Sequence, residues 1–89
     1  SMVSPLVRIR RGSAARSLLA GYEALDERAA GVRTRKGWEP VSLEDGEIGT
    51  WIARLLPLAA DVVVIGPDTL RAAMLDRLRS AAAWGGNDA

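Results

Sequence analysis

The sequence predicts an α+β fold: a ferredoxin-like split βαβ sandwich of order β-α-β-β-α-β, with one further helix at the C-terminal end. The run Val-Val-Val-Ile at residues 62–65 is typical of a strand buried on both faces, because it leaves neither face polar. Two earlier stretches, residues 5–11 and 38–44, alternate in polarity with the period of a strand. Apolar residues at helical spacing separate these strands, which indicates helices packed on one sheet.

The length of 89 residues corresponds to one domain, which we expect to span residues 5–84. Ser1 and Met2 look like the remnant of a cleaved tag, so we expect residues 1–4 to be a leader and the chain to be a fragment of a longer protein. We expect residues 85–89 to be a disordered tail. A domain this small buries only about 60–65% of its unfolded surface, so a surface for a partner is expected.

Cysteine and histidine are both absent. Their absence excludes disulfides and thiolate metal sites, and it removes the commonest general base and metal ligand. The acidic residues are scattered and form no recognisable acid–base pair. We therefore expect no catalytic residues, no metal and no cofactor, in a protein that is not an enzyme. Since no apolar run reaches the roughly 18–20 residues that span a bilayer, we expect a cytoplasmic protein without a membrane partner.

The first strand is expected to have one buried face and one solvent-exposed face. Val7 and Ile9 point to one side of it, and the alternate residues point to the other: Leu6, Arg8 and Arg10. Ser13 is a good N-cap for the helix that follows, whose apolar stripe is Ala15, Leu18, Leu19 and Tyr22. Gly21 weakens this helix, which either stops there or runs on to about Arg28; we favour the longer helix. Residues 29–31, Ala-Ala-Gly, form a helix C-terminal signal.

The middle of the chain contains a second strand and a second helix. Residues 32–37 form either a short strand or an exposed loop, and the alternating residues 38–44 follow them. Pro40 cannot donate to a strand ladder, so this strand lies at an edge of the sheet or begins after the proline. Asp45 is the expected N-cap of the helix. The apolar stripe of that helix is Ile48, Trp51, Ile52, Leu55 and Leu56, and Pro57 should end it.

The strand at residues 62–65 leads into the last helix, and we expect the helices on either side to cover it. Pro67 fits the first helical turn, where its missing N–H costs nothing. The turn at residues 66–69 lacks the glycine spacing of a nucleotide-binding loop, so we interpret it as a capped βα turn. The apolar stripe of the last helix is Leu70, Met74, Leu78 and Ala81.

Charge is unevenly distributed along the chain. Residues 1–36 hold eight basic and three acidic side chains, whereas residues 37–89 hold four basic and eight acidic ones. In a small sheet the basic residues could form one positive face, with Trp38 beside them to stack on a base or on an Arg. The candidate residues for binding nucleic acid or another effector are Arg8, Arg10, Arg11, Arg33, Arg35, Lys36 and Trp38. The alternative is that these charges only keep the sheet soluble or pair with the acidic half, and that Trp38 covers the edge of the core.

The other two tryptophans have different expected roles. Trp51 lies on the stripe of the second helix, which predicts a core or interface residue. Trp84 comes at the end of the last helix and is expected to be exposed. It is our interface candidate, because exposed aromatic residues are common anchors of protein contacts.

From Leu6 to about Trp84 the chain resembles the C-terminal extension, often called WCX, of bacterial WYL-domain transcriptional regulators, including the proteasome-accessory-factor B and C type of actinobacteria. The resemblance begins with a strand that runs into an Arg/Ala-rich helix at residues 7–16, and continues with a Trp-led strand and a helix around Trp51. The most specific part is the ending, Asp-Val-Val-Val-Ile-Gly-Pro-Asp-Thr-Leu-Arg at residues 61–71 and Arg-Leu-Arg-Ser-Ala-Ala at residues 77–82. The chain departs from the family pattern at Ala59, where the family usually has a glycine.

The resemblance implies the regulatory end of a transcription factor, which senses an effector, dimerises, or does both. Its partners would be the helix-turn-helix and WYL domains of the parent regulator and a second copy in a homodimer. Two alternatives remain: a domain that binds single-stranded nucleic acid or a nucleotide effector on the basic sheet face, and a stand-alone metabolite-binding ferredoxin-like domain. A deep pocket lined by convergent polar groups would favour the last of these.

Overall fold

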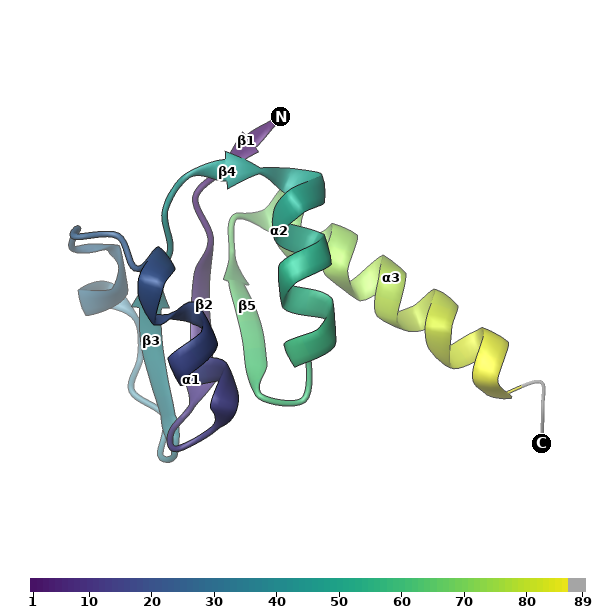
Figure 1. Ribbon diagram of the computed structural model, residues 1–89, viewed down its shortest axis with the longest axis horizontal. Coiled ribbons are helices and arrows are strands. Elements are labelled where there is room, and N and C mark those ends of the chain that lie inside the picture. Colours follow the sequence, from purple (N-terminus) through teal and green to yellow (C-terminus); the bar gives the residue numbers. More distant parts are fainter. Residues whose placement is uncertain (87–89) are drawn as a thin grey trace.

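The computed structural model describes residues 1–86 and has an α+β architecture with antiparallel sheets and three α-helices (Figure 1). Its strands are β1 (Met2–Val3), β2 (Leu6–Arg10), β3 (Trp38–Ser42), β4 (Gly46–Glu47) and β5 (Val62–Gly66). Its α-helices are α1 (Ala14–Leu19), α2 (Ile48–Leu55) and α3 (Asp68–Gly86). Short 3₁₀ turns occupy Ala20–Tyr22, Arg28–Gly31 and Leu56–Leu58.

Strand β2 is the centre of a three-stranded sheet of order β3-β2-β5, and it is antiparallel to both neighbours. Because each neighbour is antiparallel to β2, β3 and β5 run parallel to each other, and α2 lies on the connection between them. The predicted faces of β2 are confirmed: Val7 and Ile9 are fully buried, whereas Arg8 and Arg10 are not. Pro40 lies in an edge strand, as its missing N–H requires.

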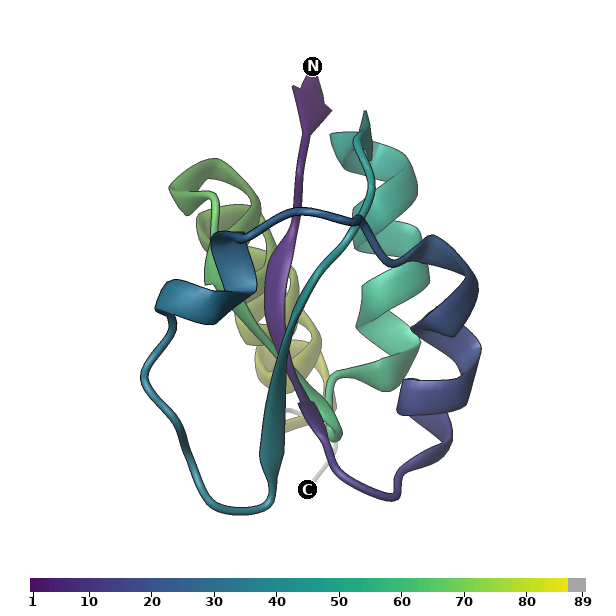
Figure 2. The same ribbon diagram turned by 90° about the vertical axis from the view of Figure 1, so that its left-hand side faces the viewer.

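The helices α1 and α2 cover one face of this sheet (Figure 2), and α3 packs beside the edge strand β5 and against α2. The core fills the space between the sheet and α1 and α2. It is built from aliphatic residues and one fully buried tryptophan, Trp51. The predicted stripe of α2 is confirmed, because Trp51, Ile52 and Leu55 are buried and their apolar neighbours Ile48 and Leu56 pack against the core.

The prediction that residues 62–65 are buried on both faces is wrong. Strand β5 is an edge strand of an antiparallel sheet, and it has one covered face. Val62 and Val64 are buried beside Ile9 and Val7, with which they are in register. Val63 is in register with Arg8 on the opposite face, where 45% of its surface remains exposed.

The prediction of a first helix that runs to Arg28 is also wrong. Helix α1 ends at Leu19 and continues as one 3₁₀ turn, after which Glu23 adopts an extended conformation. The reason is tertiary: the backbone N–H of Ala24 donates to the carbonyl of Ser42, so this segment covers the outer edge of β3. The short helix leaves Leu18 61% exposed, although it belongs to the predicted stripe. Residues 32–37 form a loop with a single β-bridge between Arg35 and Trp38, so the predicted fourth strand is absent from the described sheet.

Two predicted helix caps differ in detail. Ser13 occupies the N-cap position of α1, but its hydroxyl donates to the carbonyl of Arg10 instead of capping the helix. Helix α2 begins at Ile48, and its N-cap is Glu47, whose carboxylate accepts from the N–H of Gly49 at 2.9 Å. The predicted N-cap Asp45 is wrong, because this carboxylate accepts a hydrogen bond from the hydroxyl of Ser4.

The two ends of the chain extend beyond the predicted domain boundaries. Residues 1–4, expected to be a leader, include β1, which is antiparallel to β4 and buries Val3. Helix α3 includes Gly85 and Gly86 of the predicted tail, and residues 87–89 of that tail lie outside the described residues.

Helix α3 has a docked half and a projecting half. Leu70 and Met74 are buried, as predicted, but Leu78 and Ala81 of the same stripe are exposed. Figure 1 shows the reason, since the helix leaves the sheet at an angle and its C-terminal end points away from the domain. Within residues 1–86, no helix is both long enough and apolar enough to cross a membrane.

Candidate functional site

The open face of the sheet brings part of the predicted basic cluster together. Arg10 and Trp38 are directly opposite each other in β2 and β3, and the Arg10 guanidinium lies 4.5 Å from the centre of the Trp38 ring. Arg8 lies on the same face and donates from Nη2 to the carbonyl of Arg33 at 3.0 Å. The sheet face therefore joins the two basic segments, as the sequence predicted, and Trp38 lies among them.

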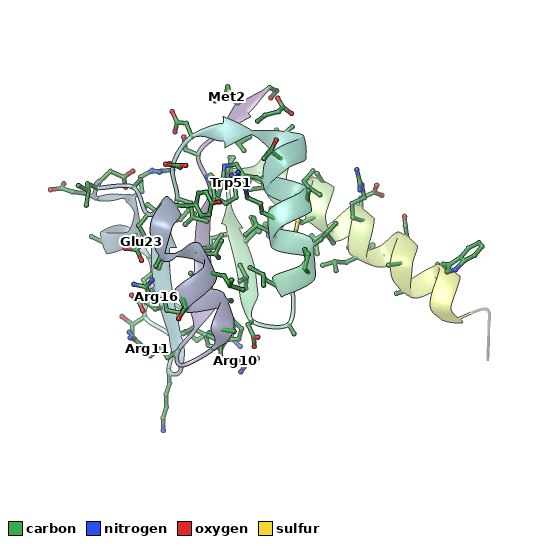
Figure 3. All side chains as sticks on the ribbon, viewed as in Figure 1. Met2, Arg10, Arg11, Arg16, Glu23 and Trp51 are labelled. Carbon is green, nitrogen blue, oxygen red and sulfur yellow. The ribbon has the colours of Figure 1, made fainter. Side chains whose placement is uncertain are left out.

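Two of these cations are already paired with acids. Nε of Arg10 lies 3.0 Å from a carboxylate oxygen of Asp61, and its Nη2 donates to the carbonyl of Ala60. Arg11 lies 3.7 Å from Glu39. The labelled side chains of Arg10 and Arg11 lie at the same end of the molecule in Figure 3. These two residues thus fit the alternative interpretation, in which basic residues pair with the acidic half of the chain.

The loop at residues 32–37 carries the remaining candidates. Arg33, Arg35 and Lys36 are exposed, and none of them forms an ion pair with another residue in the part of the chain that the structure describes. The backbone of this loop borders the open sheet face, because Arg8 donates to the carbonyl of Arg33 and Arg35 forms a β-bridge with Trp38. This border is the part of the predicted site that can still attract an anion.

A small polar pocket of about 170 Å³ lies along the outer edge of β3. Its charged lining includes Arg16, Glu23 and Glu39, and Arg16 lies 2.6 Å from Glu23 and 3.1 Å from Glu39. The hydrogen bond with Glu39 raises the pKa of Arg16 above its usual value. These charges are paired with one another in ion pairs. The pocket is also smaller than the roughly 300–1,000 Å³ of ordinary ligand sites. It does not match the deep polar pocket that a metabolite-binding domain requires.

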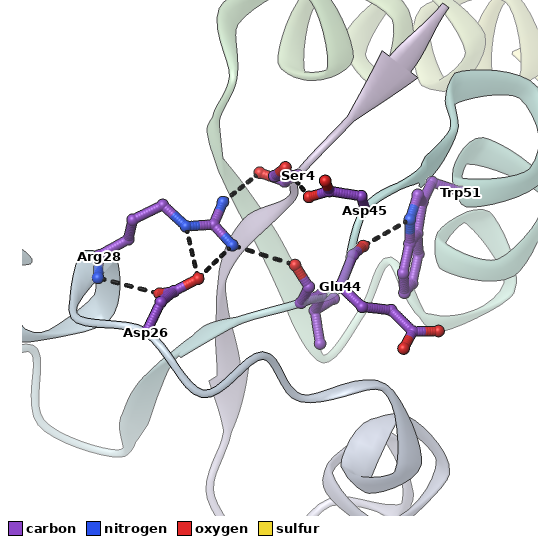
Figure 4. Close-up of polar contacts among 7 residues, drawn as sticks. Ser4, Asp26, Arg28, Glu44, Asp45 and Trp51 are labelled. Atoms are coloured by element: carbon purple, nitrogen blue, oxygen red, sulfur yellow. Dashed lines mark hydrogen bonds and ion pairs between the residues drawn. The ribbon is translucent and has the colours of Figure 1, made fainter.

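Arg28 forms a structural link that the sequence did not predict (Figure 4). Its guanidinium donates to the carbonyls of Ser4 and Leu43 at 2.7 and 3.1 Å, and to the carboxylate of Asp26 at 2.9 Å. The hydrogen bond from the Arg28 side chain, aided by the Arg28 backbone N–H, lowers the pKa of Asp26 to about 2. This pair ties the 3₁₀ turn at Arg28–Gly31 to the segments that flank β2 and β3. Arg28 holds the loop in place, since the donors of its guanidinium are already used in these hydrogen bonds.

Two further surfaces are apolar. An open groove of about 220 Å³ lies between α1 and α2, and it contains Leu18, Tyr22 and Arg54, whose guanidinium lies 4.5 Å from the Tyr22 ring. A second groove of about 240 Å³, here called the β5–α3 groove, is lined by Ala59, Val62, Val63, Val64, Arg71, Met74, Leu75 and Leu78. The predicted interface residue Trp84 is 79% exposed on α3, beyond this groove.

Among residues 1–86, no group of three or more acidic side chains is arranged to hold a metal ion. Comparison of the chain with protein-family models, with curated proteins and with solved structures finds no match in any of the three. The interpretation of the site therefore depends on the residues themselves. They form two features: a positive loop that borders the sheet face of the stacked Arg–Trp pair, and a projecting helix that bears an exposed tryptophan.

Proposed function

We propose that this chain is the WCX-type C-terminal regulatory module of a WYL-domain transcriptional regulator, and that it serves dimerisation and effector sensing. The observation that carries the proposal is the projecting half of α3, which leaves Leu78 38% exposed in the β5–α3 groove and Trp84 79% exposed beyond it. A helix that buries one half and presents the other is suited to joining domains or subunits. Of the two stretches that resemble the family ending, residues 61–71 cover β5 and the start of α3, and residues 77–82 lie farther along α3.

The sheet order supports the finer fold assignment that we propose, a ferredoxin-like sandwich. In a split βαβ unit two parallel strands, joined by a helix, flank a strand that runs the other way. The strands β3 and β5, joined through α2, flank β2 in this manner. A fourth strand would pair with the outer edge of β3, where the described residues form two isolated bridges, Glu23 with Leu43 and Arg35 with Trp38, and a loop between them. We interpret the fold as this sandwich with one edge strand reduced to a loop.

On this proposal the protein is a cytoplasmic, non-enzymatic module, and the parent regulator supplies the domains that read the promoter. We expect a helix-turn-helix and a WYL segment in the coding sequence upstream of this module. We also expect light scattering to give the mass of a dimer for the full regulator and, at high concentration, for the 89-residue chain. A strict monomer in both would contradict dimerisation, and an upstream region without those two segments would contradict the family assignment.

A second candidate function is single-stranded nucleic-acid binding on the open sheet face. It is favoured by the Arg10–Trp38 stack at 4.5 Å and by the free cations of the adjacent loop. Aromatic rings stack on bases, and basic side chains follow the phosphate backbone. Arg8 and Arg10 are bonded into the fold, so we assign the phosphate contacts to Arg33 and Arg35.

Titration with short oligonucleotides at two salt concentrations tests this second function. Each phosphate contact contributes about −0.7 to the slope of log affinity against log salt concentration for a single strand. We expect Arg33→Ala and Arg35→Ala each to reduce the slope by about that amount. The matched control is Arg79→Ala, which removes an exposed arginine from the projecting half of α3. Failure to bind at low salt, or equal effects of all three variants, would contradict this function.

A further inference from the structure

Four residues form a row across one end of the sheet: Arg35, Trp38, Arg10 and Asp61. Arg10 and Trp38 are directly opposite each other in β2 and β3, and a β-bridge places Arg35 opposite Trp38 on the other side of β3. Asp61 immediately precedes β5, and its carbonyl accepts from the backbone N–H of Arg10 at 2.8 Å. Residues directly opposite each other on paired strands project to the same face. The row therefore places an aromatic ring between two cations and ends in a carboxylate.

The guanidinium of Arg10 is held in this row by three contacts. Its Nε lies 3.0 Å from a carboxylate oxygen of Asp61, and its Nη2 donates to the carbonyl of Ala60 at 3.2 Å. Its central carbon lies over the Trp38 ring, 4.5 Å from the ring centre. The Arg10 side chain nevertheless remains 51% exposed. The ring thus covers one side of the guanidinium, and the opposite side is open to solvent.

An exposed guanidinium in a fixed position is a stacking surface for a flat ring. Unpaired bases stack on the planes of arginine guanidinium groups as well as on aromatic side chains. Ordering a long side chain normally opposes binding, but intramolecular contacts have already ordered Arg10. The Trp38 ring is itself less available, because it is only partly exposed and Arg10 lies over it. The accessible layer of the Arg10–Trp38 stack is therefore the arginine.

The cation at the other end of the row is placed to meet a phosphate. Residues directly opposite on paired strands have Cβ atoms about 4.5–5.5 Å apart, so Arg35 lies roughly 9–11 Å from Arg10 with Trp38 between them. Arg35 is exposed and forms no ion pair within residues 1–86. Asp61 lies at the far end, where its charge is paired with Arg10. The row is thus positive on the side where the backbone of a bound strand would pass.

We propose that this row binds one unpaired base of a nucleic-acid strand, which stacks on the outer side of the Arg10 guanidinium while Arg35 contacts its phosphate. We call this surface the Arg10 stacking site. Trp38 supports the guanidinium from behind, and Asp61 is a positioning residue that holds it in place. The inference rests on the second candidate function, single-stranded nucleic-acid binding, and names the group that holds the base. It differs from direct stacking on Trp38, for which Arg10 would have to leave the ring.

Replacement of Arg10 by lysine separates stacking from charge, because lysine keeps the positive charge and lacks the planar group. For a single-stranded DNA oligonucleotide we expect binding to weaken by about 5–10-fold, with an unchanged slope of log affinity against log salt concentration. An abasic oligonucleotide of the same length keeps the phosphates, so its affinity should change less than twofold. Arg79→Lys, an exposed residue of α3, is the matched control and should leave both affinities unchanged.

Replacement of Asp61 by alanine tests the positioning through the sign of its effect. A site that only attracts phosphate, or one in which the base stacks directly on Trp38, predicts tighter binding, since a negative charge is lost and Arg10 is released. The Arg10 stacking site predicts binding about 3–10-fold weaker, because the guanidinium is no longer held in place. We also expect Asp61→Asn to restore binding, since its amide oxygen still accepts from Nε of Arg10.

Fluorescence anisotropy measures these affinities, and circular dichroism checks that each variant is folded. Selective weakening of the base-containing oligonucleotide by Arg10→Lys, together with weaker binding of Asp61→Ala, supports the Arg10 stacking site. An unchanged affinity of Arg10→Lys, an equal loss with the abasic oligonucleotide, or tighter binding of Asp61→Ala overturns this site while single-stranded binding stands. A wild-type chain that binds no oligonucleotide at low salt overturns both.

Discussion

Replacing Leu70 by alanine is expected to lower the free energy of unfolding by about 3–5 kcal/mol, whereas Leu78→Ala should lower it by less than about 1 kcal/mol. Leu70 is fully buried between α3 and the core, so the substitution removes its contacts and leaves a cavity. Leu78 occurs eight residues later on the same stripe, but 38% of its surface is exposed and less packing is lost. The same chemical change therefore has different costs in the two halves of one helix.

Urea denaturation followed by circular dichroism measures this difference. The protein should be dilute, so that self-association does not stabilise the folded state by mass action. A domain of this size is expected to have roughly 4–13 kcal/mol of stability, so Leu70→Ala could leave it close to unfolded. In that case the urea midpoint of Leu78→Ala is still informative. A small shift indicates a projecting half of α3, and a large shift indicates a docked one. Equal costs would contradict the docking of α3 described here.

The pattern of α3 shows what sequence periodicity determines and what it does not. The spacing of Leu70, Met74, Leu78 and Ala81 indicated correctly that these residues share one side of a helix. It did not indicate that the domain ends midway along the helix, because the length of a core is set by the elements that the helix packs against. The predicted exposure of Trp84 is correct, because Trp84 lies beyond the last packed turn. Leu78 lies in that last turn, where it lines the β5–α3 groove and 38% of its surface is exposed.

Strand β5 shows a second structural property that the sequence pattern alone does not determine. Four β-branched residues in succession predicted a strand, and residues 62–65 are one. The number of covered faces depends on the neighbours of the strand. Since β5 pairs only with β2 at an edge of the sheet, Val63 is left half exposed beside Arg8. Burial on both faces is typical of a parallel sheet between two helical layers, which residues 1–86 do not form.

The candidate site was predictable where its residues are close in sequence or share a strand face. Arg8 and Arg10 share a face because they are two residues apart in β2, and Trp38 joins them through strand pairing. The partner of Arg10 was not predictable, because Asp61 is 51 residues away and only the β2–β5 register brings it close. Arg28 was missed altogether. Its two carbonyl partners belong to Ser4 and Leu43, and carbonyls carry no sequence signal.

Gly46→Ala is the second substitution with a large expected effect, because a Cβ at this position would collide with Trp51. The added carbon would lie 2.5 Å from Nε1 and 2.8 Å from Cδ1 of the indole. The ring is fully buried, meets Tyr22 edge to face at 5.6 Å, and donates from Nε1 to the carbonyl of Glu44, so it has little room to move. Overpacking of this kind costs about 1–3 kcal/mol.

Thermal unfolding of the Gly46→Ala variant tests this close approach. A loss of about 1–3 kcal/mol corresponds to a fall in Tm of roughly 5–20 °C for a domain of this size. Gly31→Ala is the matched control, since a Cβ at Gly31 meets no atom within 4 Å, and we expect its Tm to change by only a few degrees. If the two variants melt together, the Trp51 ring does not pack on the turn at Gly46. If only Gly46→Ala is destabilised, that glycine is required by the ring beside it, and the β1–β4 ladder and the start of α2 are positioned by the same contact.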